Sequence, residues 1–596
     1  MPWVALLPAV LAAAALTDGR HELVVAAFAV PALLWLPGRG IARRLSRDPL
    51  ERVVLAFWVS ALLAVPAVLI GMWTGLGGTG TLAAAATFTA ASERLAAPRA
   101  RRVPIGPVVG ALAVVVLVGG LAWSWRETIA RPMDGYWWFA PAESAWSEGR
   151  ATSPPTAGAG WRDRRLVGWP EAGAIRLVPR APDPFLLGPA EGPLVVALQA
   201  PVGAAMRVGD QEVIVRSQVE ESADEGPVQR YLARGVAAVE VNATLGAGQR
   251  LQIKLSQPAQ STVYLLAGPD AVWALDAGGA LRFVHYYQLL NMVEQVVWAR
   301  ELYGDRRVTD VQPPLPSYVL AAPLAVAGGE LPTANLVFLL ELLMVGIAGV
   351  LAIRAWAPRA PALTWLLPAG AVAMHGKLLL EPASAMLPDT LYTLAVLGTV
   401  TTLARSRDRG AASAYAGFSL LAQLTRYPGG LVAAIAGLFA GVPRRVAAML
   451  VLVLGVAGVF ALAGRASGSL DGWMGTVWWE TFPEHWHDEA DPAVLLARAP
   501  RFYGLWLAYA GGLPILAALR WPRGTRVALG TALVYSLLLC TIDHTPPHYF
   551  LPLLQLSAVA TACTAAAMEH PALRVGIPFV GLVGMGVAYG WMPIEG

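Results

Sequence analysis

The sequence predicts a multi-span α-helical membrane protein with one β-sandwich domain inserted on its outer face. The 596 residues are 56% hydrophobic and only 14% charged, whereas soluble proteins carry about 25% charged residues. Apolar runs recur in both halves of the chain and, at about 20 residues per crossing, allow about fifteen spans. A central stretch of short alternating runs predicts the sandwich. This composition excludes a soluble enzyme, a disordered chain and a single-pass receptor.

Five apolar segments come first, and arginine-rich loops orient them. The segments are residues 1–19, 22–39, 53–75, 80–93 and 105–124. The first lacks the basic start and cleavage site of a signal peptide, so we expect a retained helix. The loops IARRLSRDPLER and SERLAAPRARR follow the second and fourth segments. Because basic loops stay in the cytoplasm, we predict a cytoplasmic N-terminus and an outward exit near residue 125.

The central stretch up to residue 318 contains no predicted span. Runs such as GPLVVALQ, GDQEVIVRS and QRLQIKLS are separated by Gly- and Pro-containing turns, a pattern typical of a small antiparallel sandwich. We therefore expect five parts: N-terminal transmembrane helices (1–104), a first core helix with an outer interfacial helix (105–160), the extracytoplasmic sandwich (161–283), outer interfacial helices (284–330) and the transmembrane core with the C-terminal helices (331–596).

Ten further apolar segments follow the insert. They are residues 334–354, 361–376, 388–403, 411–425, 429–441, 446–463, 503–519, 527–541, 549–567 and 575–591. Arginines occur in every second connecting loop, at residues 354–359, 405–409, 444–445, 520–526 and 574. This alternation places those loops inside and the loops between them outside.

Most chemically reactive side chains fall in the loops predicted to lie outside. Acids, histidines and many Trp and Tyr residues gather there, whereas the inner loops hold little beyond arginine. We therefore expect an active or binding site that opens to the outer membrane surface. No P-loop, dinucleotide-binding glycine motif, G-x-S-x-G or H-E-x-x-H is present, so ATP-driven transport and nicotinamide chemistry have no support.

Asp134 is the most specific candidate in these outer loops. It follows the fifth apolar segment and precedes Tyr136, Trp137 and Trp138 in an amphipathic stretch. An interfacial helix there would hold the carboxylate at the depth of the lipid headgroups. Such a group can act as a general base on an acceptor hydroxyl. A solvated loop aspartate or a helix N-cap is the ordinary structural explanation.

Several segments occur in an order that resembles a known enzyme superfamily. After the Asp134 region come QPPLPSYVLAAPLAVAGG (312–329), MLPDTLYTLAVLGTVTTLARSR (386–407), LTRYPGG (424–430) and PPHYFLPLLQLSAV (546–559). Their order, spacing and shared outer placement resemble the core of the GT-C superfamily of membrane glycosyltransferases. The layout is most similar to the protein-mannosyltransferase and aminoarabinose-transferase branch.

The resemblance implies transfer of a sugar from a polyprenyl-phosphate donor to an acceptor on the outer face. By that resemblance Asp134 would be the catalytic base and Asp389 the second acidic residue of the catalytic pair. The chain departs from the family because the sandwich follows the Asp134 region directly. In addition, the segment that begins at His285 looks like the family's first outer helix but lacks an aspartate at its start. The base is therefore Asp134 or a group such as His285 or Glu294.

A phosphate-linked sugar also needs cations for its phosphate and aromatic faces for its ring. Lys377 and Arg426 are predicted at outer helix ends, where a cation is costly unless it meets an anion, and both side chains suit phosphate. Snorkelling would also explain Lys377, and a pair with a nearby carboxylate would also explain Arg426. Asp389 follows Pro388 at the start of a span, where the helix dipole stabilises a carboxylate.

Four more candidates complete the predicted donor site. His375 and Glu381 lie near Lys377 in the densest polar cluster beside an apolar run. His548 and Tyr549 precede a late span, where they can contact donor or lipid, or simply begin a helix.

One predicted outer loop contains the types of side chain that bind metal ions. Residues 478–491 contain a His-x-His pair among acids, which suits a divalent ion. The loop lacks a zinc signature, so a solvated acidic loop with interfacial tryptophans is the preferred interpretation. We assign no metal ligand or cofactor, and the use of a divalent metal ion stays an open alternative.

These observations predict an inverting hexosyl or pentosyl transferase of the cell envelope, embedded in the inner membrane with a periplasmic active site. Its expected partners are a polyprenyl-phosphate sugar, a glycan, lipid or protein acceptor, and membrane lipid, without nucleic acid. The alternative is a transporter or flippase for a lipid-linked saccharide, or a non-catalytic assembly subunit. Transporters show repeats and polar groups near the midplane, so the one-sided placement of polar residues favours the enzyme.

Overall fold

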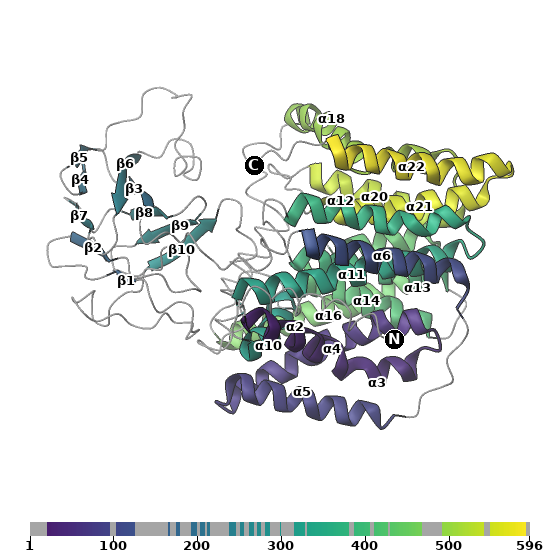
Figure 1. Ribbon diagram of the computed structural model, residues 1–596, viewed down its shortest axis with the longest axis horizontal. Coiled ribbons are helices and arrows are strands. Elements are labelled where there is room, and N and C mark those ends of the chain that lie inside the picture. The colour runs from purple at the N-terminus through teal and green to yellow at the C-terminus, as the bar shows by residue number, and fades with distance from the viewer. Residues whose placement is uncertain are drawn as a thin grey trace. The chain divides into compact units, whose positions relative to one another are not determined.

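The chain consists of two compact units (Figure 1). The computed structural model describes residues 21–95, 103–124, 165–166, 174–178, 192–199, 203–208, 211–214, 238–245, 251–255, 262–267, 271–275, 281–286, 299, 315–327, 330–380, 387–405, 410–426, 429–467, 492–540 and 549–591. The helical unit comprises Met1–Ile129, Arg307–Ala327 and Thr333–Gly596, and the strand unit comprises Ala130–Arg306 and Gly328–Pro332.

The helices follow the predicted apolar segments closely. They are α2 (His21–Leu34), α3 (Leu36–Leu45), α4 (Pro49–Trp73), α5 (Gly77–Glu93), α6 (Ile105–Ser124), α10 (Leu315–Ala327), α11 (Glu330–Trp356), α12 (Leu367–Leu380), α13 (Leu387–Ala404), α14 (Ala411–Thr425), α15 (Gly429–Phe439), α16 (Pro443–Ser467), α18 (Pro492–Tyr509), α19 (Leu513–Ala518), α20 (Arg523–Cys540), α21 (Phe550–Ala567) and α22 (Pro571–Trp591). A short 3-10 helix, Ala362–Leu366, precedes α12.

Six helices in the described part of the chain are long and apolar enough to cross a membrane. They are Val24–Leu45, Pro49–Trp73, Ile105–Ser124, Thr333–Trp356, Phe550–Ala567 and Pro571–Gly590. The expectation of a multi-span helical membrane protein is therefore confirmed. The larger predicted number of about fifteen crossings stays a prediction.

Burial separates the inner helices of the helical unit from its rim. The apolar window of α11 is 100% buried and that of α21 is 89% buried, whereas α22 is only 22% buried. Large apolar side chains such as Phe579 and Val580 are exposed on α22. Helices α11 and α21 therefore lie at the centre of the helical unit, and α22 lies at its rim.

Small residues allow the central helices to approach one another closely. A Cβ added to Gly349 of α11 would lie 2.6 Å from Gln555 Oε1 of α21 and 2.9 Å from Pro368 of α12. Close approach at small residues is the usual basis of helix packing in membranes. In addition, the indole N–H of Trp356 in α11 donates to the Val400 carbonyl of α13 at 2.9 Å. Helix α11 therefore packs against three helices that come from later parts of the chain.

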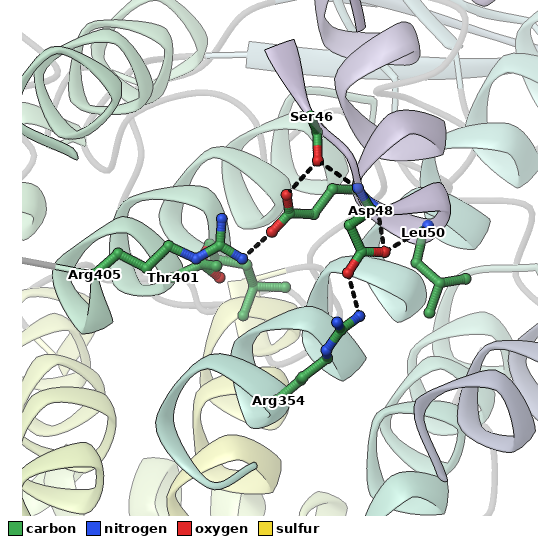
Figure 2. A network of polar contacts seen from close by, with 8 residues as sticks. Ser46, Asp48, Leu50, Arg354, Thr401 and Arg405 are labelled. Atoms are coloured by element: carbon green, nitrogen blue, oxygen red, sulfur yellow. Dashed lines mark hydrogen bonds and ion pairs between the residues drawn. The ribbon is translucent and has the colours of Figure 1, made fainter. Parts of the chain in front are cut away.

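One end of the helical unit, the basic end, collects arginines and their partners. Figure 2 shows the centre of this network, where Asp48 binds Arg354, and where Ser46 and Arg405 flank the same turn. Arg405 pairs with Glu51, and Asp48 also accepts a hydrogen bond from the Leu50 amide at 2.9 Å. The turn before α4 thus binds the C-terminal ends of α11 and α13.

The other arginine-rich loops belong to the same end. Arg574 at the start of α22 donates to the Arg359 carbonyl at 3.4 Å, and Arg359 follows Arg354 by one short turn. Arg520 pairs with Glu569 at 3.2 Å, which joins the loop before α20 to the loop before α22. Loops that the sequence predicts on one side of the membrane therefore meet at one end of the helices.

The described part of the strand unit forms two five-stranded antiparallel sheets. The strands are β1 (Arg165–Leu166), β2 (Ala174–Val178), β3 (Gly192–Gln199), β4 (Ala205–Val208), β5 (Gln211–Ile214), β6 (Ala238–Leu245), β7 (Leu251–Leu255), β8 (Thr262–Ala267), β9 (Ala271–Leu275) and β10 (Leu281–Tyr286). One sheet has the order β1-β2-β7-β4-β5 and the other β10-β9-β8-β3-β6. The predicted strand GPLVVALQ is β3 without any shift in its bounds.

The last strand crosses residue 283, where the sequence predicts the end of the sandwich. Strand β10 continues to Tyr286, with His285 paired to Val272 and Tyr286 to Ala271. A register shift between Phe283 and His285 interrupts the alternation there, as a β-bulge does. His285 therefore belongs to a sheet and not to a following interfacial helix.

The network at the basic end yields a stability prediction. Asp48→Ala removes both the N-cap of α4 and the pair with Arg354, whereas Asp48→Asn keeps a capping oxygen. Loss of a cap costs about 1 kcal/mol, so we expect the alanine variant to unfold at a lower temperature than the asparagine variant in thermal melts of the purified protein. Equal melting temperatures would show that the cap contributes nothing.

Candidate functional site

Helix α13 connects the basic end to the opposite end of the helical unit. Arg405 follows its last residue at the basic end, and Asp389 lies in its first turn. An 18-residue helix is about 27 Å long, which approaches the thickness of the hydrocarbon core. Asp389 thus lies at the end of α13 opposite the arginine network.

The local sequence explains how Asp389 and Arg426 reach this end. Pro388 fits the first turn of α13, where its missing N–H is not needed. Helix α14 ends at Thr425, and Arg426 is extended with φ −151° and ψ 135°. The Gly429 amide then donates to the Arg426 carbonyl at 2.9 Å, and this tight turn leads into α15.

Asp389, Arg426 and Tyr549 form the candidate site, named here the Arg426 cluster. Arg426 Nε donates to Asp389 Oδ1 at 3.0 Å and Arg426 Nη2 donates to Asp389 Oδ2 at 2.8 Å. The guanidinium carbon lies 5.1 Å from the ring centroid of Tyr549, the residue before α21, in the range of a cation–π contact. The Asp389 side chain is fully buried and that of Arg426 is 12% exposed. Three helix ends thus converge on one guanidinium.

A second polar contact lies beside this cluster. Thr390, the neighbour of Asp389 in α13, donates its hydroxyl to Glu341 Oε2 of α11. Glu341 is fully buried. Its other oxygen, Oε1, has no hydrogen-bond partner among the residues that the structure describes. The rings of Tyr392 and Tyr535 lie 5.7 Å apart.

These neighbours were not among the sequence candidates. Glu341 is the one acid inside the apolar run 334–354, and an acid within a span is a functional candidate by default. The sequence therefore carries a signal for Glu341, although this residue lies outside the polar loops. Thr390, Tyr392 and Tyr535 carry no such signal, because hydroxyl groups are common in membrane helices.

The structure places the other predicted residues apart or leaves them outside the described residues. His375 is buried in α12, with its ring 6.4 Å from that of Phe338. Neither of its ring nitrogens has a hydrogen-bond partner in the described part of the chain. Lys377 lies in the same helix, and its side chain is outside the described residues. The side chain of His285 also lies outside the described residues. Entirely outside the described residues are Asp134, Tyr136, Trp137, Glu294, Glu381, His548 and the loop 478–491.

The geometry defines what the cluster can do chemically. A bidentate arginine–carboxylate pair fixes the plane of the guanidinium, and a buried pair avoids the cost of an isolated charge in lipid. Asp389 uses both oxygens to hold Arg426, so its observed role is to orient the cation. The alternative explanation for Arg426, a pair with a nearby carboxylate, is what the structure shows. An oriented arginine at an aromatic helix end is suited to bind an anion.

Among the described residues, no group of three or more His, Cys, Asp or Glu side chains is placed to hold a metal ion.

Comparison of the chain with protein-family models, with curated proteins and with solved structures found no match.

The buried pair predicts strongly non-additive mutations. Arg426→Met leaves the Asp389 carboxylate buried without this partner, and breaking a buried pair in this way costs about 3 kcal/mol. The double variant Asp389→Leu with Arg426→Met removes both charges, so we expect it to melt at a higher temperature than Arg426→Met alone.

Arg405→Met is the matched control, because its pair with Glu51 is 45% exposed on the arginine side and surface pairs contribute less than about 1 kcal/mol. Additive losses in the double variant would contradict the prediction.

Proposed function

We propose that the protein is a membrane glycosyltransferase that moves a sugar from a polyprenyl-phosphate donor to an acceptor at the membrane surface. The observation that supports this proposal is the Arg426 cluster, a cation held in place by a buried carboxylate and an aromatic ring. It lies at the end of the helices opposite the basic end. The resemblance of the sequence to GT-C enzymes supports the same function.

Arg426 binds the donor phosphate in this proposal. A guanidinium has two edges with paired N–H donors. Asp389 occupies the Nε–Nη2 edge, and phosphate binds along the edge formed by Nη1 and Nη2. The carboxylate and the Tyr549 ring keep that edge oriented, so little side-chain entropy is lost when the phosphate binds. Lys377 adds a second cation.

Asp134 is the base in this proposal and Asp389 is a positioning residue. Asp134 accepts the proton of the acceptor hydroxyl as its oxygen attacks the anomeric carbon. The bond from that carbon to the phosphate oxygen breaks, and the polyprenyl phosphate leaves with the electron pair. A single displacement inverts the anomeric centre. His285 or Glu294 takes the role of base if Asp134 does not.

The proposal includes the finer topology. About fifteen helices cross an inner membrane, the basic end is cytoplasmic, and the two sheets form a sandwich on the periplasmic side.

A transporter of lipid-linked saccharides is the second candidate. Glu341 and His375 are ionisable residues buried in the helical unit, and such residues mark ion and substrate pathways in transporters. The two functions differ in their products, because only the enzyme releases polyprenyl phosphate.

Sidedness is tested by labelling with a membrane-impermeant maleimide. The two native cysteines are buried, so the unmodified chain is the blank. We expect Thr74→Cys, at the end of α4 away from Asp48, to react from the periplasm. Ser413→Cys, near the basic end of α14, reacts only after the membrane is opened. The reverse pattern would place the Arg426 cluster in the cytoplasm.

Activity is tested with purified protein and a panel of polyprenyl-phosphate sugars, scored by release of polyprenyl phosphate. We expect Asp134→Asn to lower the turnover rate by at least about 100-fold, the contribution of a general base, with donor binding unchanged. Glu212→Gln is the matched control, because Glu212 is an exposed carboxylate on β5.

Arg426→Lys is expected to weaken donor binding about tenfold, because lysine cannot form the bidentate contact. Full activity in Asp134→Asn would remove Asp134 from the mechanism. Saccharide uptake into vesicles without release of lipid phosphate would favour the transporter.

A further inference from the structure

Two neighbouring residues of α13 are held from two different helices. Asp389 binds Arg426, which follows α14. Thr390 donates its hydroxyl to Glu341 of α11. Both contacts join residues far apart in sequence, and Asp389, Thr390 and Glu341 are all fully buried. The first turn of α13 is therefore bound on two sides.

The first turn of a helix is the part that most needs such contacts. Its amide groups have no acceptors within the helix, so the turn frays unless other groups hold it. Thr393 donates to the Asp389 carbonyl at 2.6 Å, which adds a contact within the turn but none to another helix. Successive side chains on a helix point about 100° apart, so the rotation that suits the Glu341 contact also determines where Asp389 points.

We infer that Glu341 is a positioning residue for the Arg426 cluster. By accepting the Thr390 hydroxyl, it fixes the rotation and height of the first turn of α13. Asp389 then presents both carboxylate oxygens to Arg426 at 3.0 and 2.8 Å. The inference rests on the proposed function for the ligand of Arg426, whereas the contact can be tested without that ligand.

The test measures how fast phenylglyoxal, an arginine-specific reagent, modifies Arg426 in the purified full-length protein. Arg426 is 12% exposed and paired with Asp389, so we expect slow modification in the unmodified chain. Asp389→Asn, which weakens the pair directly, provides the reference for fast modification. The modified fraction is followed by mass spectrometry of the peptide that contains residue 426.

Four variants separate positioning from other roles. Thr390→Val and Glu341→Leu remove the hydrogen bond, so modification of Arg426 should accelerate about fivefold to tenfold, the factor that one buried hydrogen bond corresponds to. Glu341→Gln keeps an acceptor oxygen and should restore a rate close to that of the unmodified chain. Thr399→Val is the matched control, because Thr399 is buried in the same helix and its hydroxyl donates within the helix, to the Ala395 carbonyl at 3.0 Å, with no bond to another helix among the described residues.

Two results would overturn the inference. Equal rates in Thr390→Val and Thr399→Val would show that the hydroxyl does not position Asp389. A rate in Glu341→Gln as fast as in Glu341→Leu would show that Glu341 acts through its charge. If Glu341→Leu does not fold, Thr390→Val carries the comparison, because valine has nearly the shape of threonine.

A second experiment tests the donor site separately from the positioning role of Glu341. Undecaprenyl phosphate added to the unmodified chain should protect Arg426 from the reagent, and loss of this protection in Thr390→Val is expected under both proposals. Absence of protection in the unmodified chain counts against the donor site alone, since the variant rates without lipid still decide the role of Glu341.

Discussion

The structure depends on one constraint, namely that a charge within a membrane protein needs a partner. The helical unit satisfies it at both ends of α13. Arg405 pairs with Glu51 at the basic end, and Asp389 pairs with Arg426 at the other. Between these ends, α13 is mostly buried apolar surface that packs against α14, α15 and α21. The places where these charges meet determine the positions of the loops, of the ends of α11 and α14, and of the candidate site.

Much of the fold could be predicted from the sequence because apolar runs have sharp ends. Helices α6 and α14 begin and end where the runs 105–124 and 411–425 do. The apolar run 503–519 predicts one span, but it divides into the end of α18 and the short helix α19. Gly511 and Gly512 cause the division, since they have positive φ values of 56° and 77°. The glycines are visible in the apolar run, but their φ values are not. Positive φ is a property of the turn, and hydropathy carries no information about it.

The candidate site was predictable as residues but not as contacts. Asp389, Arg426 and Tyr549 were each selected from their places at helix ends. Their convergence requires three helix ends from separate parts of the chain to meet, and no local pattern encodes that. Glu341 is not among the predicted site residues, because the apolar run around it predicts a membrane span and the site was expected in the polar loops. A single acid in such a run is a stronger signal than an acid in a polar loop, because the lipid environment makes it costly.

The ion pairs at the two ends of α13 also limit how the protein can move. Sliding α13 along its axis by one turn, about 5.4 Å, would break the contacts of Arg405 and of Asp389 together. The turn between α14 and α15 is closed by two hydrogen bonds of 2.9 Å, from the Gly429 amide to the Arg426 carbonyl and from the Gly430 amide to Gln423 Oε1. Any motion of the helical unit is therefore expected to leave the axial position of α13 unchanged.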